Sequence, residues 1–320
     1  MEINKFICDM VPGDHVEGIY ILKTAQPRTT AAGKPFLAAS LADCSGSVEA
    51  KLWDYSGPLG TMDEGKPVRV QVAVSDYRGA LQLIIERIAL VTAEELTDAD
   101  RDRLVPVAPI DRNDYFQGIS ELVDSISDAD YRSICQALLR QYGDRLRSIP
   151  AGKSVHHSFL GGLLMHTGNM LRTADFLAQQ YDDTINRSLL LAGTLLHDLA
   201  KTDEFTFSVL GLVTEYSVRG QLLGHLVMGA QYVADTARAL GVSEEKSTLL
   251  QHMLLSHHGQ PEFGAAVLPA IPEAELLSCI DSIDSRMEIY RTAMEETGAG
   301  GFSKRIFALD RRIYNHGTKD

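Results

Sequence analysis

Eight of the ten histidines in this 320-residue chain lie between residues 156 and 258, where chance would place roughly a third of them. Two aspartates accompany them, one directly after a histidine and one further along the chain. Imidazole nitrogen and carboxylate oxygen together suit divalent Mn, Fe, Co, Ni or Zn. The four cysteines are scattered and form no CxxC pair, which disfavours a structural zinc site. The clustered histidines are His156, His157, His166, His197, His225, His252, His257 and His258, and the aspartates are Asp198 and Asp281. The pattern predicts a divalent-metal site within this group, with His252 expected to be a helix-surface or core histidine instead of a ligand.

The adjacent pair His197-Asp198 closes an apolar run, LLLAGTLLHDLAK, that has helical character. Neighbouring residues on a helix point about 100° apart, so both can reach one ion only if it lies off the flank of the helix. Its other ligands must then come from neighbouring helices. Ligands fixed on packed helices, with positions left open to water, are typical of a catalytic metal centre.

The elements that must hold these ligands show helical periodicity from about residue 113 onward. Gly241 and Gly298 stand where C-terminal helix caps are expected. A charged stretch at 96–112, with Pro106 and Pro109, is expected to be a linker. The helical patterns cover about 113–126, 128–147, 159–180, 185–201, 220–240, 243–257 and 273–297.

Before the linker the sequence instead has the period-two alternation of strands. The clearest case is 68–77, where every second residue from Val68 to Val74 is valine. Five such segments with short turns predict a small closed barrel. The expected strands are 15–24, 36–42, 48–55, 68–77 and 81–91. The fold class is therefore two domains, an all-β barrel at 1–95 and an all-α domain at 113–320.

The composition limits the classes of molecule that the chain is expected to bind. The chain carries 30 basic and 43 acidic side chains, a formal charge of −13, which excludes a non-specific, electrostatic binder of nucleic acid. The start of the chain has no signal-peptide pattern, and no segment approaches the length of a membrane span. Together with the scattered cysteines, these features predict a cytoplasmic protein without a membrane partner.

The order of His166, the His197-Asp198 pair and Asp281 resembles the H…HD…D signature of the HD-domain phosphohydrolase superfamily. The resemblance implies that these four residues are the primary metal ligands, with Asp198 also catalytic. Asp284 shares the helix face of Asp281 and is the rival ligand. The histidines of GQLLGHLVMGA and LLSHHGQPEFGA resemble the extra ligands of two-metal members. Carried over, His225 and one of His257 or His258 bind a second ion. Lys201, one turn after His197, is expected to hold a phosphate oxygen in catalysis.

The resemblance extends over nearly the whole chain. The stretches FLAASLADCSGSVEAKLWD and VRVQVAVSDYRGALQLIIERIALV resemble OB-fold nucleic-acid-binding domains. With KSVHHSFLGGLLMHT, HDLAK, SHHG and GGFSKRIFALDRRIYNH, the chain resembles the YhaM-type 3′→5′ exoribonucleases. This implies release of nucleoside 5′-monophosphates from the 3′ end of single-stranded RNA or DNA. It also implies one or two divalent ions, Mn²⁺ before Fe, Co, Ni or Mg, and a homo-oligomer.

The same resemblance suggests where a strand binds. Trp53, Tyr55 and Tyr77 are candidates to stack on bases, and Lys51, Arg69 and Arg78 to contact phosphates. Trp53 has an alternative role as a plug in the barrel core. His156 and His157 either contact substrate or pack at the start of a helix. Lys304 and Arg305 either contact the nucleic-acid backbone or belong to a solvated tail.

Two other functions compete with the exonuclease. One is an HD-domain phosphohydrolase of nucleotides or cyclic dinucleotides with a regulatory barrel. The GYP-like motif of cyclic-dinucleotide members is missing, and SHHGQPE stands in its place. The other is a non-catalytic single-strand DNA-binding or replication factor, against which the complete set of ligands argues.

Overall fold

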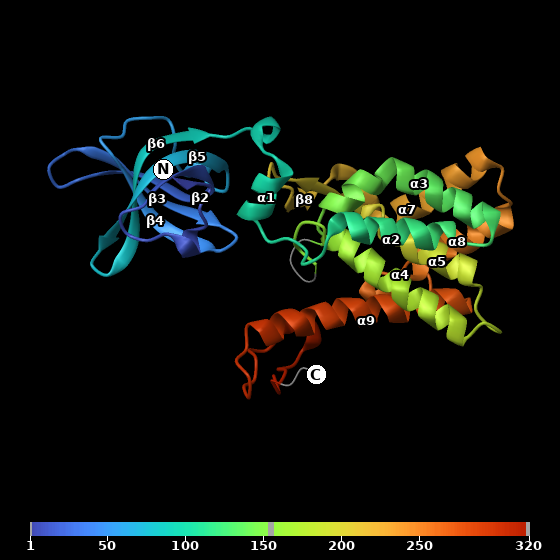
Figure 1. Cartoon of the computed structure of the whole chain (residues 1–320). Helices are drawn as coiled ribbons and strands as arrows, with labels where there is room; N and C mark the ends of the chain where they lie inside the picture. The colour runs from blue at the N-terminus through green and yellow to red at the C-terminus, as the bar shows by residue number, and fades with distance from the viewer. Residues whose placement is uncertain (1, 153–156, 318–320) are drawn as a thin grey trace. The chain divides into compact units, whose positions relative to one another are not determined.

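The computed structural model describes residues 2–152 and 157–317, and its contacts divide the chain into two compact units (Figure 1). The first unit extends to Pro106 and includes Ser208–Gly211; the second comprises Val107–Phe207 and everything from Leu212 onward. The stretch expected as a linker contains a short helix, α1 (Asp98–Leu104), with Thr97 as its N-cap. This helix belongs to the first unit.

The first unit is a closed five-stranded barrel with a short extra strand, β1 (Glu2–Ile3), paired to its outside. The barrel strands are β2 (His15–Thr29), β3 (Pro35–Asp43), β4 (Gly46–Trp53), β5 (Pro67–Tyr77) and β6 (Ala80–Leu90). They are hydrogen-bonded in the order β2-β3-β4-β6-β5, and β5 returns to pair with β2. This closed order, with β4 and β6 parallel, is the topology of an OB-fold.

Alternation along each strand fills the barrel with apolar side chains. Val68, Val70, Val72 and Val74 are all buried, as their spacing predicts. Strand β2 is longer than expected, because Pro27 continues the ladder opposite Leu37 instead of starting a turn. That part of β2 is bonded only to β3, and proline is tolerated on such an edge.

The second unit is helical, with one small hairpin. Its N-caps are mostly Asp, Asn or Ser side chains that accept backbone N–H groups, as at Asp111, Asp128, Ser217 and Ser243. The helices are α2 (Arg112–Asp124), α3 (Ala129–Ser148), α4 (Gly162–Gln180), α5 (Arg187–Leu196), α6 (Lys201–Glu204), α7 (Val218–Leu240), α8 (Glu244–Ser256) and α9 (Pro272–Glu295). The hairpin is formed by β7 (Phe205–Phe207) and β8 (Val213–Tyr216).

Helix α5 lies at the centre of this unit. Every residue from Ser188 to Leu196 is buried, and the helix packs against α3, α4, α8 and α9. An element buried on all sides is held rigidly, so its end is a fixed point from which ligands can be presented.

Of the two predicted caps, Gly241 ends α7 in the left-handed conformation at φ 70°. The expectation for Gly298 was wrong, because α9 ends at Glu295 with Glu296 as its cap and Gly298 has no positive φ. Among the described residues, no helix has both the length and the apolar character needed to cross a membrane.

Candidate metal centre and nucleic-acid interface

The C-terminal end of α5 presents the His197-Asp198 pair. His197 is the C-cap of the helix and is fully buried. Its Nδ1 lies 2.8 Å from the carbonyl oxygen of Thr194, one turn earlier, so Nδ1 donates and Nε2 is left to accept a ligand. The first of the two predicted ligands is thus fixed by the backbone of its own helix.

Two further side chains meet this histidine from neighbouring helices. His166 of α4 brings its Nε2 to 3.3 Å from Nε2 of His197. Asp281 of α9 places Oδ1 3.4 Å from the same His166 nitrogen. Asp198 completes the group, with Oδ2 3.4 Å from Nε2 of His197 and 3.7 Å from Nε2 of His166. Ligand atoms of His166, His197 and Asp198 lie within 4.8 Å of one another, and Asp281 forms a second such group with His197 and His257.

A second group lies on the other side of Asp198. His225, His257 and His258 place ring nitrogens within 4.8 Å of one another. The other carboxylate oxygen of Asp198, Oδ1, is 3.3 Å from Nε2 of His225 and 3.8 Å from Nε2 of His257. Asp198 consequently faces both groups, one oxygen to each. A carboxylate in this position is suited to bridge two cations.

The chain reaches this second group through a break in α7. Gly224 has φ 69° and ψ 163°, a conformation that interrupts the helix and that glycine adopts without steric cost. Directly after it, His225 donates its backbone N–H to Oε1 of Glu204, at 2.9 Å, and its Nδ1 lies 2.9 Å from the same oxygen. Glu204 is buried at the end of α6. Sequence reasoning missed it because it lies in a short helix that the periodicity did not separate.

Four of the histidines share one orientation. In each, Nδ1 contacts an oxygen behind the ring and Nε2 points into the cluster. The partners are Asp284 Oδ2 for His166 at 2.7 Å, Thr194 O for His197 at 2.8 Å, Glu204 Oε1 for His225 at 2.9 Å and Leu254 O for His257 at 2.8 Å. Such outer partners fix the tautomer and the ring direction of metal-binding histidines. Asp284 therefore orients His166, whereas Asp281 faces the ligand point itself.

The donor set fits divalent cations. Ligand atoms about 2.1 Å from a metal are separated by about 3.0 Å in an octahedron and 3.4 Å in a tetrahedron. The separations of 3.3 to 3.7 Å in the first group lie close to this range. Four buried atoms of the cluster residues have no hydrogen-bond partner: Oδ1 of Asp198, Nε2 of His225, Nε2 of His257 and Nδ1 of His258. Buried polar atoms without a partner are costly, so these atoms indicate a ligand.

The ionisable groups of the cluster shift one another's pKa values. Burial would raise the pKa of Asp198, but Lys201 and His197 hold it well below its usual value. Burial would lower the pKa of His166, but hydrogen bonds to Asp281 and Asp284 outweigh burial and raise it to about 10. The pKa of His257 is lowered by burial and by neighbouring His197. The carboxylates thus stay ionised and attract a positive charge, whether a proton or a metal ion.

A pocket of about 360 Å³ opens beside the cluster. Lys201 lies in its wall, with Nζ 2.7 Å from Oδ2 of Asp198, and the pKa of this lysine is raised by that carboxylate despite burial. A charged ammonium here is placed to contact an anionic group in the pocket, as the spacing from His197 predicts. The complete lining comprises Asp198, Lys201, His257, His258, Gly259, Gln260, Phe263, Glu275, Ser278, Asp281, Ser282 and Ser285.

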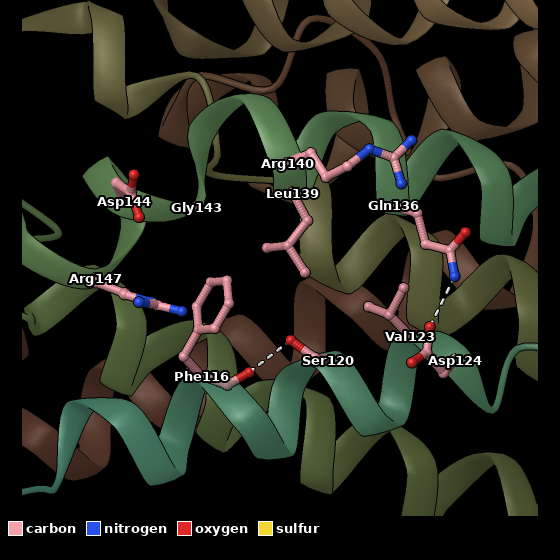
Figure 2. A pocket seen from close by; sticks show the side chains of 10 residues that line it. All are labelled: Phe116, Ser120, Val123, Asp124, Gln136, Leu139, Arg140, Gly143, Asp144 and Arg147. Atoms are coloured by element: carbon pink, nitrogen blue, oxygen red, sulfur yellow. Dashed lines mark hydrogen bonds between the residues drawn. The ribbon is translucent and has the colours of Figure 1, made fainter.

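A larger hollow of about 430 Å³ lies between α2 and α3 (Figure 2). Its lining includes Phe116, Arg140 and Arg147 but none of the predicted metal ligands. Figure 2 shows Arg147 beside the ring of Phe116, whose centroid is 3.7 Å from the guanidinium carbon. The smaller pocket, which the unpartnered atoms face, is therefore the candidate active site.

The remaining predicted residues of this unit lie elsewhere. His157 is buried, with Nε2 3.5 Å from Asp284 and 4.0 Å from Glu288. Its ring nitrogens lie close enough to His166 and Asp284 for the three to form a further group of possible ligands. His156 lies outside the described residues. In the C-terminal segment Lys304 and Arg305 are exposed, and Arg305 pairs with Asp310.

On the barrel, five exposed or half-buried side chains form one aromatic–cationic cluster. Trp53 and Tyr77 are 45% and 49% exposed, so Trp53 is not a core plug. Nζ of Lys51 lies 5.5 Å from the Trp53 ring and 5.1 Å from the Tyr77 ring. The cluster is completed by Phe36, 5.2 Å from Trp53, and by Arg78, 5.2 Å from Tyr77. Aromatic faces interleaved with cations are suited to stack bases and neutralise phosphates.

Two predicted barrel residues are outside this cluster. Tyr55 packs against the barrel core, and its hydroxyl accepts the N–H of Leu59 at 2.8 Å. Arg69 is exposed on β5, eight strand positions before Tyr77 and thus about 26 Å away along the strand.

Comparison with known proteins agrees with this description. The HD-domain family matches residues 163–286. A "3'-5' exoribonuclease YhaM" of Listeria innocua is 35% identical over 99% of both chains. Proteins of the same name from Shouchella clausii and Bacillus licheniformis are 35% and 34% identical over 94% of this chain, covering 93% and 95% of theirs.

Among solved structures, the second OB-fold domain of replication protein A from Methanococcus maripaludis aligns with 28% of this chain and 95% of its own, at 16% identity and a TM-score of 0.22. The full-length curated relatives and the matched HD domain decide the assignment. The chain belongs to the family of 3'-5' exoribonuclease YhaM.

Proposed function

We propose that this chain is a divalent-metal-dependent 3′→5′ exoribonuclease that removes nucleoside 5′-monophosphates one at a time from single-stranded RNA. The observation that carries this proposal is Asp198 at the wall of the pocket: one of its oxygens lies 3.4 Å from Nε2 of His197, and the other lies 3.3 Å from Nε2 of His225. Paired cation sites sharing a carboxylate are suited to phosphodiester hydrolysis. The names of the curated relatives and the HD domain support the same reaction.

The residues divide into two sets of ligands. His166, His197, Asp198 and Asp281 would hold the first ion, and His225, His257 and His258 with Asp198 would hold the second; the groups of neighbouring ligand atoms around His197 and His257 support this division. When bound, the ions acidify an attacking water and offset negative charge on the phosphodiester. The mixed nitrogen and oxygen donors are compatible with Mn²⁺, which we propose as the working metal.

Lys201 contributes to catalysis as a fixed cation. Its hydrogen bond to Asp198 holds the ammonium at the pocket wall, and its raised pKa keeps it charged at neutral pH. It therefore contacts a non-bridging oxygen of the scissile phosphate, where it adds positive charge and orients the group. Asp198 would therefore be a metal ligand as well as the hydrogen-bond partner of this lysine.

The aromatic–cationic cluster of the barrel binds the single strand upstream of the cleaved end. Trp53 and Tyr77 stack on unpaired bases, which duplex bases cannot offer, and Lys51 and Arg78 contact the backbone. A chain with a net charge of −13 binds nucleic acid in this way because the local aromatic–cationic cluster supplies the contacts that an overall positive charge would otherwise give. Lys304 and Arg305 remain candidates for further backbone contacts. The predicted homo-oligomer and cytoplasmic location stay predictions.

The test uses full-length protein stripped of metal and reconstituted with Mn²⁺. The substrate is single-stranded RNA labelled uniformly in its backbone phosphates, with either end blocked in parallel reactions. We expect mononucleotide release that depends on Mn²⁺ and stops when the 3′ end is blocked. Release that continues with the 3′ end blocked would contradict the direction of cleavage, and equal release without metal would contradict the metal centre.

A further inference from the structure

The pocket beside the metal cluster has a second wall that the proposed chemistry does not use. One side of the pocket is formed by Asp198, Lys201 and His257, which belong to the cluster. The other side is formed by the turn that follows α8 and by one face of α9. The unpartnered Oδ1 of Asp198 and Nε2 of His257 are buried at this pocket and indicate that it receives a ligand.

The turn after α8 carries an exposed aromatic ring. Phe263 ends the short 3-10 turn Pro261–Phe263, lines the pocket and is 70% exposed. An apolar ring left in solvent at the mouth of a polar pocket has no packing role that accounts for it. A nucleic-acid base can stack on such a face whatever its identity, as an enzyme that removes every nucleotide in turn requires.

The facing side of α9 carries oxygen donors and acceptors. Glu275, Ser278 and Ser282 follow one another at spacings of three and four residues, so they share a helix face next to Asp281. Glu275 lies about 9 Å along the helix from Asp281, which places it a short way beyond the cluster. It is exposed rather than buried.

The turn and the helix approach each other closely between these residues. A Cβ at Gly259 would lie 2.5 Å from Oγ of Ser278, and Gly259 has φ +76°. Only glycine allows the turn to pass over Ser278 at this distance. The wall that contains Phe263 and the wall that contains Glu275 are thus held on either side of one narrow space.

We propose that Phe263, Glu275 and Ser278 form the subsite for the 3′-terminal nucleoside, and that Glu275 and Ser278 recognise its vicinal 2′- and 3′-hydroxyls. This inference rests on the proposed function. A carboxylate has two oxygens and accepts hydrogen bonds from two neighbouring hydroxyls. Only the 3′ end of RNA carries such a pair, because deoxyribose lacks the 2′-hydroxyl. A 3′-phosphate would bring negative charge against Glu275 and is excluded.

The test compares three ten-nucleotide RNAs that differ only at the 3′ end: ribose, 2′-deoxyribose or 3′-phosphate. With wild-type protein and Mn²⁺, we expect kcat/KM for the first cleavage to fall about tenfold on loss of the 2′-hydroxyl. In Glu275→Gln the ratio between the ribose and deoxyribose ends should fall, because the amide keeps one acceptor oxygen in place of two while Ser278 is unchanged. The 3′-phosphate should be tolerated better, because the negative charge is gone. Glu262→Gln is the matched control, because Glu262 is an exposed glutamate in the turn that carries Phe263 but does not line the pocket.

The aromatic wall is tested separately. Phe263→Ala should raise KM about tenfold for all three RNAs and leave the ratio between ends unchanged. Phe176→Ala, which removes another exposed ring, on α4, should not change KM. Binding of the ribose and deoxyribose RNAs to metal-free protein, followed by fluorescence anisotropy, gives a readout that does not depend on turnover.

The outcomes separate the two proposals. If the wild type releases no mononucleotide from the 3′ end, the proposed function is wrong. If it does so, and Glu275→Gln keeps the wild-type preference for ribose in both kinetics and binding, the terminal subsite is wrong. A wild-type enzyme that cuts the ribose and deoxyribose ends equally well would overturn the subsite as well.

Discussion

Glu204 provides the sharpest test of how the second group of ligands is assembled. Its Oε1 accepts two hydrogen bonds from His225, one from the backbone N–H and one from Nδ1, both at 2.9 Å. The first bond fixes the backbone after the break in α7. The second holds the proton on Nδ1 and leaves the lone pair of Nε2 facing Asp198. Removing Glu204 should therefore weaken metal binding without removing any ligand.

The expected loss of metal affinity depends on how many of the hydrogen bonds to His225 each substitution removes. Loss of an outer partner of a metal-binding histidine costs 10- to 100-fold in metal affinity, equivalent to about 1.4 to 2.7 kcal/mol. Glu204→Gln keeps an oxygen that can accept the backbone N–H and loses only the charge, so we expect the lower end, about tenfold. Glu204→Ala removes both bonds, so we expect about 100-fold.

The assay is isothermal titration of metal-stripped protein with Mn²⁺, fitted to two sites. Only the site that contains His225 should weaken, since the first group draws its orientation from Asp284 and Thr194. Glu215→Gln serves as the control, because Glu215 is an exposed glutamate on β8. Urea unfolding of each variant separates loss of the site from loss of the fold. Equal weakening of both sites, or unchanged binding in Glu204→Ala, would refute the assigned role.

Three further predictions test other parts of the chain. Asp198→Ala should abolish Mn²⁺-dependent mononucleotide release and reduce binding at both metal sites, measured by gel assay and titration; loss at a single site would contradict the proposal that Asp198 is a ligand at both. Trp53→Ala should weaken binding of single-stranded RNA to metal-free protein by about 5- to 100-fold, the worth of one stacked base, and an unchanged anisotropy curve would exclude Trp53 from the interface. Asp128→Ala should lower the free energy of unfolding by about 1 kcal/mol at neutral pH, because the carboxylate caps α3 and pairs with Lys246. Burial would raise the pKa of the Asp128 carboxyl, but Lys246 and the backbone N–H groups lower it below the ordinary value of 3.8. Its contribution to the free energy of unfolding is therefore complete above pH 3.8 and is lost as the pH falls further. The difference between variant and wild type should shrink in acid unfolding curves.

The predicted elements that agree best with the structure are those whose signals are local. Five strands and seven long helices appear close to their expected positions, because alternation and helical periodicity are read over a few residues. The misses are also local. Pro27 continues a strand because that part of β2 is an edge, and Gly298 lies beyond the end of α9 rather than at its cap. Glu204 and the hairpin after it fall in a stretch too short for either period to show.

The sequence by itself indicated a strand-rich part followed by a helical part and a cluster of histidines, and it predicted an ordered set of metal ligands from His166 to Asp281. Residue type carries that information, since imidazole and carboxylate groups are potential metal ligands that can be recognised in the sequence. Only the tertiary structure decided that Asp281 faces the cluster while Asp284 holds His166 from behind. It likewise decided that Lys51, Trp53 and Tyr77 meet on the barrel while Tyr55 and Arg69 do not. Asp281 and Asp284 are three positions apart and share a helix face, so the sequence cannot tell which of them faces the metal cluster. That choice depends on how α9 packs against the neighbouring helices.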